Sequence, residues 1–247
     1  MVKPDNKKNG KDASHTQSNK KSIGQLRERS LHRAIIEWIS EPGDEPEVRV
    51  DGYVADLVRG RQIIEIQTGN FSAIKFKLKR LLENHSVRLV FPIAQEKWIV
   101  TKDEAGQKIL SRRKSPKRGS LLDLFTELVR IPELINHPDF SLTVLLIQTE
   151  EIRCDDGQGS WRRKGVSIIN RHLLKVVQKV EFNHLEDFSV FLPKELPEAF
   201  LNKDLAKLLK VPLYRSRRIV YCLSKMGLIE ETGRIRNGKI YQQKYQD

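Results

Sequence analysis

Apolar residues near the start of the chain repeat first at helical spacing and then in the alternating pattern of strands. In "IGQLRERSLHRAIIEWIS", residues 23–40, the apolar side chains lie near one helical stripe, and "EPGDEP" ends the helix. Three strand-like runs follow, "EVRV", "GYVADLVRG" and "RQIIEIQT". After the break "TGN", "FSAIKFKLKRLLENH" returns to helical spacing and precedes the apolar strand "VRLVFPIA". The predicted order is helix, three strands, helix, strand.

The middle of the chain, residues 97–186, shows no single period. We predict a strand at "KWIV", a basic loop at "SRRKSPKRGS", a helix at "LLDLFTELVR" and a strand at "SLTVLLIQTEE". The Gly- and Asp-rich break "CDDGQGS" follows the last of these. These elements do not by themselves predict how the region folds.

The C-terminal stretch has a clearer plan. We predict a short helix capped by Asn202, a turn at "KVPL", and a second helix from Tyr214 to Met226 that ends at Gly227. Two strands around a Gly-containing turn follow in "LIEETGRIRNGKIYQQK". Helix, turn, helix and hairpin is the plan of a winged helix, so we predict a winged-helix DNA-binding domain over residues 192–247.

The charge of the chain indicates its class of partner. The formal net charge is +13, of which six lysines against Asp5 and Asp12 contribute +4 within the first 24 residues. Such an excess favours a polyanion, most commonly nucleic acid. Residues 1–22 contain no apolar run, so we predict a disordered basic tail and no signal peptide. No stretch approaches the length of a membrane span, and we expect a soluble, cytoplasmic protein with no membrane partner.

One face of the predicted hairpin is polar by placement. In "YVADLVRGRQIIEIQTG", Glu65 and Gln67 point to one side of their strand because strand side chains alternate, and Asp56 lies on the strand before. Two carboxylates on paired strands can bind one hard cation such as Mg²⁺. The non-functional alternative is that Asp56 and Glu65 are solvent-facing residues of a half-exposed sheet.

This pattern resembles the PD-(D/E)XK, or restriction-endonuclease-like, nuclease superfamily. The signature of that superfamily is an Asp followed about ten residues later by Glu-x-Lys, on an α-β-β-β-α-β core, and Asp56 and Glu65-Ile66-Gln67 fill those positions. The resemblance implies an α/β (α+β) fold with that αβββαβ core in residues 23–186, interrupted by the basic-loop insertion. It also implies a DNA endonuclease in which Asp56 and Glu65 bind Mg²⁺ or Mn²⁺, with Gln67 and a helix carboxylate, Glu37, completing the catalytic set. We interpret His32 on the same helix as structural.

Two positions depart from the superfamily pattern. Ala55 stands where proline is usual, and Gln67 replaces the lysine. Glutamine has no positive charge to stabilise a phosphate in transition. A substitute lysine is available on the next helix, from Lys75, Lys77 or Lys79.

Clustered cations supply the candidate DNA contacts. The basic loop and the winged helix contribute Arg112, Arg113, Lys114, Lys117 and Arg118, then Arg215, Arg217 and Arg218, and Arg234 and Arg236. A solvated charge run, or a winged helix that contacts protein, is the alternative. The chain has no Walker A loop, so we expect no nucleotide cofactor. Homodimerisation is left open.

Two functions from different classes follow. The first is a Mg²⁺-dependent DNA endonuclease acting in DNA repair, restriction or mobile-element defence. The second is a non-catalytic winged-helix DNA-binding regulator or assembly subunit, whose nuclease-like domain is degenerate.

Overall fold

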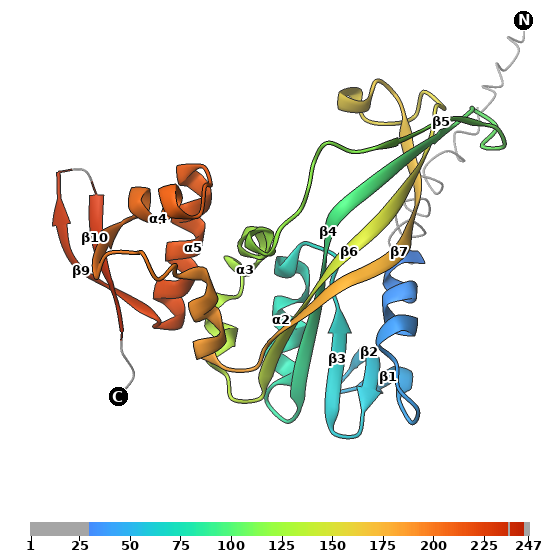
Figure 1. Cartoon of the computed structure of the whole chain (residues 1–247). Coiled ribbons are helices and arrows are strands. Elements are labelled where there is room, and N and C mark those ends of the chain that lie inside the picture. The colour runs from blue at the N-terminus through green and yellow to red at the C-terminus, as the bar shows by residue number, and fades with distance from the viewer. Residues whose placement is uncertain (1–29, 237, 245–247) are drawn as a thin grey trace, which may run out of the picture.

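The chain forms a mixed α/β structure with one seven-stranded mixed sheet and one small three-stranded antiparallel sheet (Figure 1). The computed structural model describes residues 30–236 and 238–244. The tail predicted over residues 1–22, and the first part of the predicted helix, lie outside the described residues.

The predicted order of the first elements is confirmed. Helical residues 30–39 lead into three strands, a helix and a strand. These are β1 (Glu45–Val50), β2 (Tyr53–Arg59), β3 (Gln62–Ile66), α2 (Phe71–Leu81) and β4 (Ser86–Lys102). Helical spacing marks the two helices, and short apolar runs between turn residues mark the strands.

The large sheet has the strand order β1-β2-β3-β4-β6-β7. The seventh strand, β5, is outside this order and pairs only with β4 among the described strands. β1, β2 and β3 form an antiparallel meander, whereas β3, β4 and β6 run parallel. β6 (Phe140–Cys154) and β7 (Ser167–Phe182) pair antiparallel at the far side. The parallel strands are the most buried part of the sheet, as expected when helices cover both faces.

Helices cover the two faces of this sheet separately. Leu31 and Ile35 of the first helix pack with Ile64 on one face, whereas Leu78 of α2 packs with Ile63 on the other. Neighbouring residues of β3 therefore serve different cores, which is the consequence of side-chain alternation. Glu65, next to Ile64, lies on the α2 side.

The middle region differs from its prediction. β4 is one continuous strand of 17 residues rather than separate strands up to Ala94 and at "KWIV", because its pairing with β6 continues across a bulge between Ala94 and Glu96. Figure 1 shows β4, β6 and β7 extending together far beyond the shorter strands.

The basic loop prediction is wrong for its first half. Arg112, Arg113 and Lys114 belong to β5 (Ile109–Lys114), which pairs antiparallel with β4. All six residues of β5 are exposed, so it has none of the apolar alternation by which a strand is predicted. Charged residues are typical of an exposed edge strand.

The predicted helix at "LLDLFTELVR" is shorter than expected. It comprises the 3₁₀ turn η1 (Leu121–Leu124) followed by α3 (Phe125–Leu128). Three further 3₁₀ segments are described, η2 (Pro132–Asn136), η3 (Trp161–Arg163) and η4 (Leu185–Phe191).

The C-terminal part contains the two predicted helices and hairpin. The elements are β8 (Ala199–Leu201), α4 (Asn202–Leu208), α5 (Leu213–Met226), β9 (Ile229–Ile235) and β10 (Gly238–Gln243). Gly227 ends α5 in the left-handed conformation at φ 87°, as predicted. The predicted Asn202 cap is wrong: Asn202 is already helical, and the Asp204 carboxylate accepts the Leu201 amide at 2.8 Å.

One hydrophobic cluster joins the C-terminal elements to the rest. Ile219 and Leu223 of α5 belong to the same buried cluster as Phe125 of α3 and Leu78 of α2. Arg215 of α5 also pairs with the Asp123 carboxylate of η1. Across the residues described, no helix is both long and apolar enough to span a membrane.

Candidate active site

The site lies where β2 separates from β3. The two strands pair from Arg59 and Gln62 as far as Leu57 and Ile64. One step further along this register, the Asp56 Oδ2 atom accepts the Ile66 backbone N–H at 2.8 Å. A carboxylate thus takes a position that a strand carbonyl would otherwise occupy, and it is fixed beside Glu65.

His32 is the unexpected member of this site. Its Nε2 atom lies 3.0 Å from the Asp56 Oδ2 atom, across from the first helix to β2. The hydrogen bond with Asp56 is the largest cause of a raised His32 pKa, and the charges of Asp56 and Glu65 add to it against the effect of burial. The interpretation of His32 as merely structural missed this contact, because helical spacing alone does not show which sheet residue faces a helix.

Lys77 of α2 brings a cation to Glu65. Its Nζ atom donates to the Glu65 Oε2 atom at 2.5 Å and to the Val54 carbonyl at 2.6 Å. The other two candidates face elsewhere: Lys75 and Lys79 both pair with Glu133, at 2.7 Å and 3.7 Å. Among the three lysines proposed from the sequence, only Lys77 therefore reaches Glu65.

Glu65 is a buried carboxylate with incomplete pairing. Its side chain is only 4 % exposed, and its Oε1 atom is buried without a hydrogen-bond partner among the described residues. Burial and the neighbouring Asp56 charge raise the pKa of Glu65 to about 7, and Lys77 offsets only part of this effect. An unpaired buried oxygen of this kind is costly unless a ligand completes it.

Gln67 has a different task from a motif lysine. Its side-chain amide donates to the Gly69 carbonyl and, at 3.4 Å, to the Asn70 carbonyl. Its backbone N–H donates to the Val90 carbonyl at 2.9 Å. Gln67 therefore holds the turn that leads from β3 into α2, and so positions the helix that bears Lys77.

Glu37 is not brought to Asp56. Its carboxylate is 66 % exposed and pairs with Arg33, one turn earlier on the same helix, at 3.2 Å. His32 faces Asp56 instead, and five residues of helix place Glu37 about 140° away around the axis. The prediction of a helix carboxylate at this position is therefore wrong, and the helix presents an imidazole.

The donor set suits a hard cation held mainly by water and substrate. The described residues contain no group of three or more His, Cys, Asp or Glu side chains arranged to hold a metal ion. Mg²⁺ is commonly bound through one or two carboxylates while waters and substrate phosphate complete its octahedron. Asp56 and Glu65 supply two such carboxylates, so the chemistry of the donors fits Mg²⁺ or Mn²⁺. The Glu65 Oε1 atom is enclosed by protein, so a cation with its waters would have to uncover it.

The basic residues predicted to bind DNA are partly occupied by acids. Lys114 and Arg118 pair with Glu96 at 2.7 Å and 3.0 Å, and Arg112 pairs with Glu150 at 3.0 Å. Arg113 and Lys117 are exposed. Paired surface cations can still contact phosphate, but they must exchange partners to do so.

On the C-terminal elements, Arg215 is used internally by its pair with Asp123. Arg217 and Arg218 are exposed near the start of α5, and the Arg218 guanidinium lies 5.9 Å from the centre of the Tyr214 ring. Arg234 pairs with Glu231 at 2.8 Å. Arg236, in the turn that follows β9, is exposed.

Comparison with known proteins places the chain in a family. A protein of Treponema pallidum (strain Nichols), described as an uncharacterized protein, is 35 % identical over 187 residues, covering 75 % of this chain and 74 % of the relative. No solved structure matches the chain. The model of the family described as "Domain of unknown function (DUF8091)" matches residues 29–183, which include the Asp56, Glu65 and Lys77 site. The chain belongs to the DUF8091 family.

Proposed function

We propose that this protein is a Mg²⁺- or Mn²⁺-dependent DNA endonuclease of the PD-(D/E)XK type. The observation that carries the proposal is the set of contacts around Glu65: Lys77 lies 2.5 Å from one oxygen, the other oxygen has no hydrogen-bond partner among the described residues, and Asp56 lies beside it. The helix, β1-β2-β3 meander, α2 and parallel β4 support the restriction-endonuclease-like αβββαβ core. The C-terminal helices and hairpin support the winged-helix domain.

The residues have separable tasks in this proposal. A bound divalent cation would neutralise phosphate charge and lower the pKa of a water molecule. Asp56 and Glu65 would hold the cation, and the Ile66 amide fixes the Asp56 carboxylate in place. Lys77 donates to Glu65 and Val54, which fixes the ammonium beside the carboxylate, and its third hydrogen would be available to a phosphate oxygen.

His32 is a positioning residue in this scheme. Its hydrogen bond to the Asp56 Oδ2 atom restrains that carboxylate from the side of the first helix. Gln67 acts less directly: it holds the turn that orients α2, and α2 bears Lys77. Neither residue is assigned contact with the reacting phosphate.

Cleavage of circular DNA tests the proposal directly. The purified full chain is incubated with supercoiled plasmid and with circular single-stranded DNA, in Mg²⁺, in Mn²⁺ and in EDTA. We expect metal-dependent nicking or linearisation, lost by about 1000-fold in Asp56→Asn because removal of a metal ligand removes several kcal/mol of charge stabilisation. DNA affinity in EDTA should be unchanged or higher.

The chain offers a matched control for this variant. His85 pairs with Asp51 at 3.1 Å, and their side chains are 30 % and 29 % exposed, compared with 29 % and 21 % for His32 and Asp56. Asp51→Asn therefore removes a His–Asp pair of the same geometry away from Glu65. Equal loss of cleavage in both variants, or undiminished cleavage in Asp56→Asn, would contradict the metal-site assignment.

The second candidate is a non-catalytic DNA-binding protein. The exposed arginines of α5 favour it, because DNA binding through Arg217 and Arg218 needs no metal at Glu65. Wild-type protein that binds DNA but cleaves neither substrate in Mg²⁺ or Mn²⁺ would support this function instead.

A further inference from the structure

One edge of β4 is open next to the candidate active site. β3 stops pairing with β4 at Ile66 and Val90, and β5 begins to pair only at Trp98. Between these points two backbone carbonyls of β4 accept hydrogen bonds on this edge. The Val90 carbonyl accepts from the Gln67 backbone N–H at 2.9 Å, and the Ala94 carbonyl accepts from the Gly119 backbone N–H at 3.1 Å. Since backbone groups alternate along a strand, the Pro92 carbonyl faces this same open edge.

Proline at this point has a physical reason. Pro92 has no N–H, so leaving its edge without a neighbouring strand loses no donor. Gly119 closes the far end of the gap, where a Cβ atom would lie 2.5 Å from the Ala94 carbonyl oxygen. The backbone at Gly119 therefore lies directly against β4.

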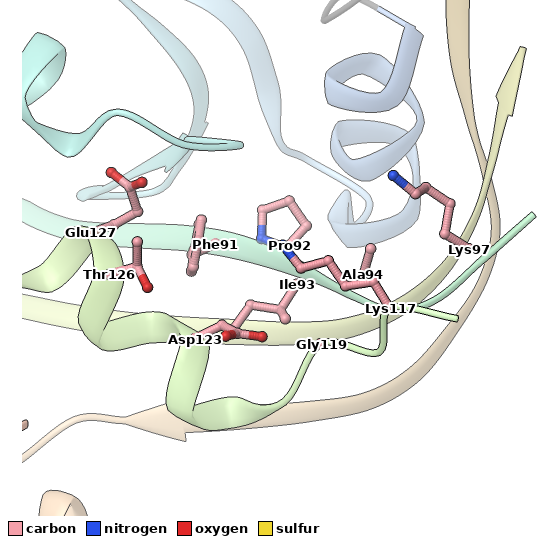
Figure 2. A pocket seen from close by; sticks show the side chains of 10 residues that line it. All are labelled: Phe91, Pro92, Ile93, Ala94, Lys97, Lys117, Gly119, Asp123, Thr126 and Glu127. Carbon is pink, nitrogen blue, oxygen red and sulfur yellow. The ribbon is translucent and has the colours of Figure 1, made fainter. Parts of the chain in front are cut away.

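A pocket of about 280 Å³ occupies this gap (Figure 2). Phe91, Pro92, Ile93 and Ala94 of β4 supply apolar surface. The opposite wall is polar and comes from the segment that runs through η1 into α3, with Lys117 at its start and Asp123, Thr126 and Glu127 along it. Lys97 lies at one end, with its ammonium 3.3 Å from the Glu151 carboxylate.

The pocket adjoins the segment that links Glu65 to Lys77. The Glu127 Oε2 atom accepts the backbone N–H of Phe71, the first residue of α2, at 3.1 Å. The Phe71 ring also makes an edge contact with the Phe91 ring, at 5.0 Å between centres. A molecule in the pocket would lie one strand away from Glu65, on the α2 side of the sheet.

We propose that this pocket binds a single nucleobase of the DNA strand that enters the active site. The inference rests on the proposed nuclease function. The volume is at the lower limit of small-molecule sites, which start near roughly 300 Å³, and suits one base rather than a larger ligand. The apolar floor contacts a base face, the Pro92 carbonyl and the Glu127 Oε1 atom suit exocyclic amino groups, and Lys117 suits the attached phosphate.

Isotope-edited NMR with mononucleotides tests the pocket without requiring cleavage. The isoleucine δ-methyl groups of the full chain are labelled, and the Ile93 signal is assigned with Ile93→Val. The four deoxynucleoside 5′-monophosphates are titrated in EDTA, alongside deoxyribose 5-phosphate and inorganic phosphate. We expect a saturable shift of the Ile93 methyl with a Kd of about 1 mM for at least one nucleotide, and none with the two base-free compounds.

Thr126→Trp is designed to fill the pocket from an exposed position of its rim, and should weaken this binding at least tenfold. Asn136→Trp, on an exposed position of η2 outside the pocket, should leave the Kd unchanged. An equal shift from inorganic phosphate, no shift from any nucleotide, or full binding by Thr126→Trp would overturn the pocket assignment. Plasmid cleavage by the same wild-type preparation reports separately on the nuclease proposal.

Discussion

Two glutamates are almost fully buried in the large sheet, and they differ in how many cations surround the carboxylate. Glu65 of β3 and Glu151 of β6 expose 3 % and 1 % of their surface. Around Glu151 lie Lys97, Arg153 and Arg171, with contacts of 2.7 to 3.3 Å to both carboxylate oxygens. In the part of the chain that the structure describes, Glu65 has one ion-pair partner, Lys77, and its Oε1 atom has no hydrogen-bond partner.

The electrostatic outcome is opposite in the two places. Burial acts to raise the pKa of Glu151, but the hydrogen bond from Arg153 and the surrounding cations outweigh it and the pKa is lowered. At Glu65, burial and the Asp56 charge dominate and the pKa is raised to about 7. Equal burial therefore does not indicate equal roles: a satisfied carboxylate holds strands together, whereas an unsatisfied one leaves capacity for a ligand.

The sharpest test of this contrast is Glu65→Gln. We expect metal-dependent DNA cleavage to fall by about 1000-fold, because the amide keeps the shape but loses the negative charge that holds the cation. The free energy of unfolding, from urea titrations without metal, should stay within about 1 kcal/mol of wild type, because a strained buried charge is removed. Strong destabilisation would show that Glu65 is structural like Glu151.

Glu151→Gln should behave in the reverse manner. It leaves three cations around a neutral amide, so we expect a loss of about 3 kcal/mol in the free energy of unfolding. Cleavage per folded molecule should remain within about twofold of wild type. A stable variant with lost cleavage would place Glu151 in the functional site and remove the contrast.

Lys77→Met tests whether the helix lysine replaces the missing motif lysine. We expect cleavage to fall by about 100-fold while DNA affinity in EDTA changes by less than about threefold, because one cation at the developing charge is lost. Lys75→Met, which removes the neighbouring pair with Glu133 at 2.7 Å, is the matched control. Equal effects of the two substitutions would mean that Lys77 has no special task.

The smallest of these expected effects is on the pH dependence of stability, which should have opposite signs for Glu65 and Glu151. Because the folded-state pKa of Glu65 is raised from 4.5 to about 7, its folded form binds more protons in that window. Stability relative to Glu65→Gln should therefore fall as pH rises from about 4.5 to 7, by on the order of 2 kcal/mol without metal.

Glu151 has a lowered pKa, so the sign is reversed. Its contribution to stability is present above pH 4.5 and is lost as pH falls through the lower folded-state pKa. Urea denaturation of wild type and both glutamine variants, from pH 3.5 to 8 in EDTA, measures the two differences. Parallel pH profiles for the two pairs would contradict the assigned charge states.

Asp56 needs separate treatment. Repulsion between two facing carboxylates alone would make Asp56→Asn neutral or slightly stabilising, as for Glu65→Gln. In the structure, however, the Asp56 carboxylate accepts the Ile66 amide and contacts His32, so some native interaction is weakened as well. Stability is therefore a cleaner readout at Glu65 than at Asp56.

The sequence alone was sufficient for features that depend on short-range patterns. The order of elements from the first helix to β4, the two C-terminal helices and their hairpin, and the end of α5 at Gly227 all follow from local periodicity and turn chemistry. Asp56 and Glu65 could be placed together because register within a short hairpin is set by its turn.

Tertiary structure decided which side chains meet across elements. Three lysines on α2 were equivalent in the sequence, and the rotation of that helix on the sheet brought Lys77 to Glu65 and turned the other two to Glu133. In the same way, the rotation of the first helix about its axis brings His32, and not Glu37, to Asp56. The sequence also did not predict the exposed edge strand β5 or the open edge at Pro92. Pairing between distant segments leaves no periodic pattern in the sequence of either segment.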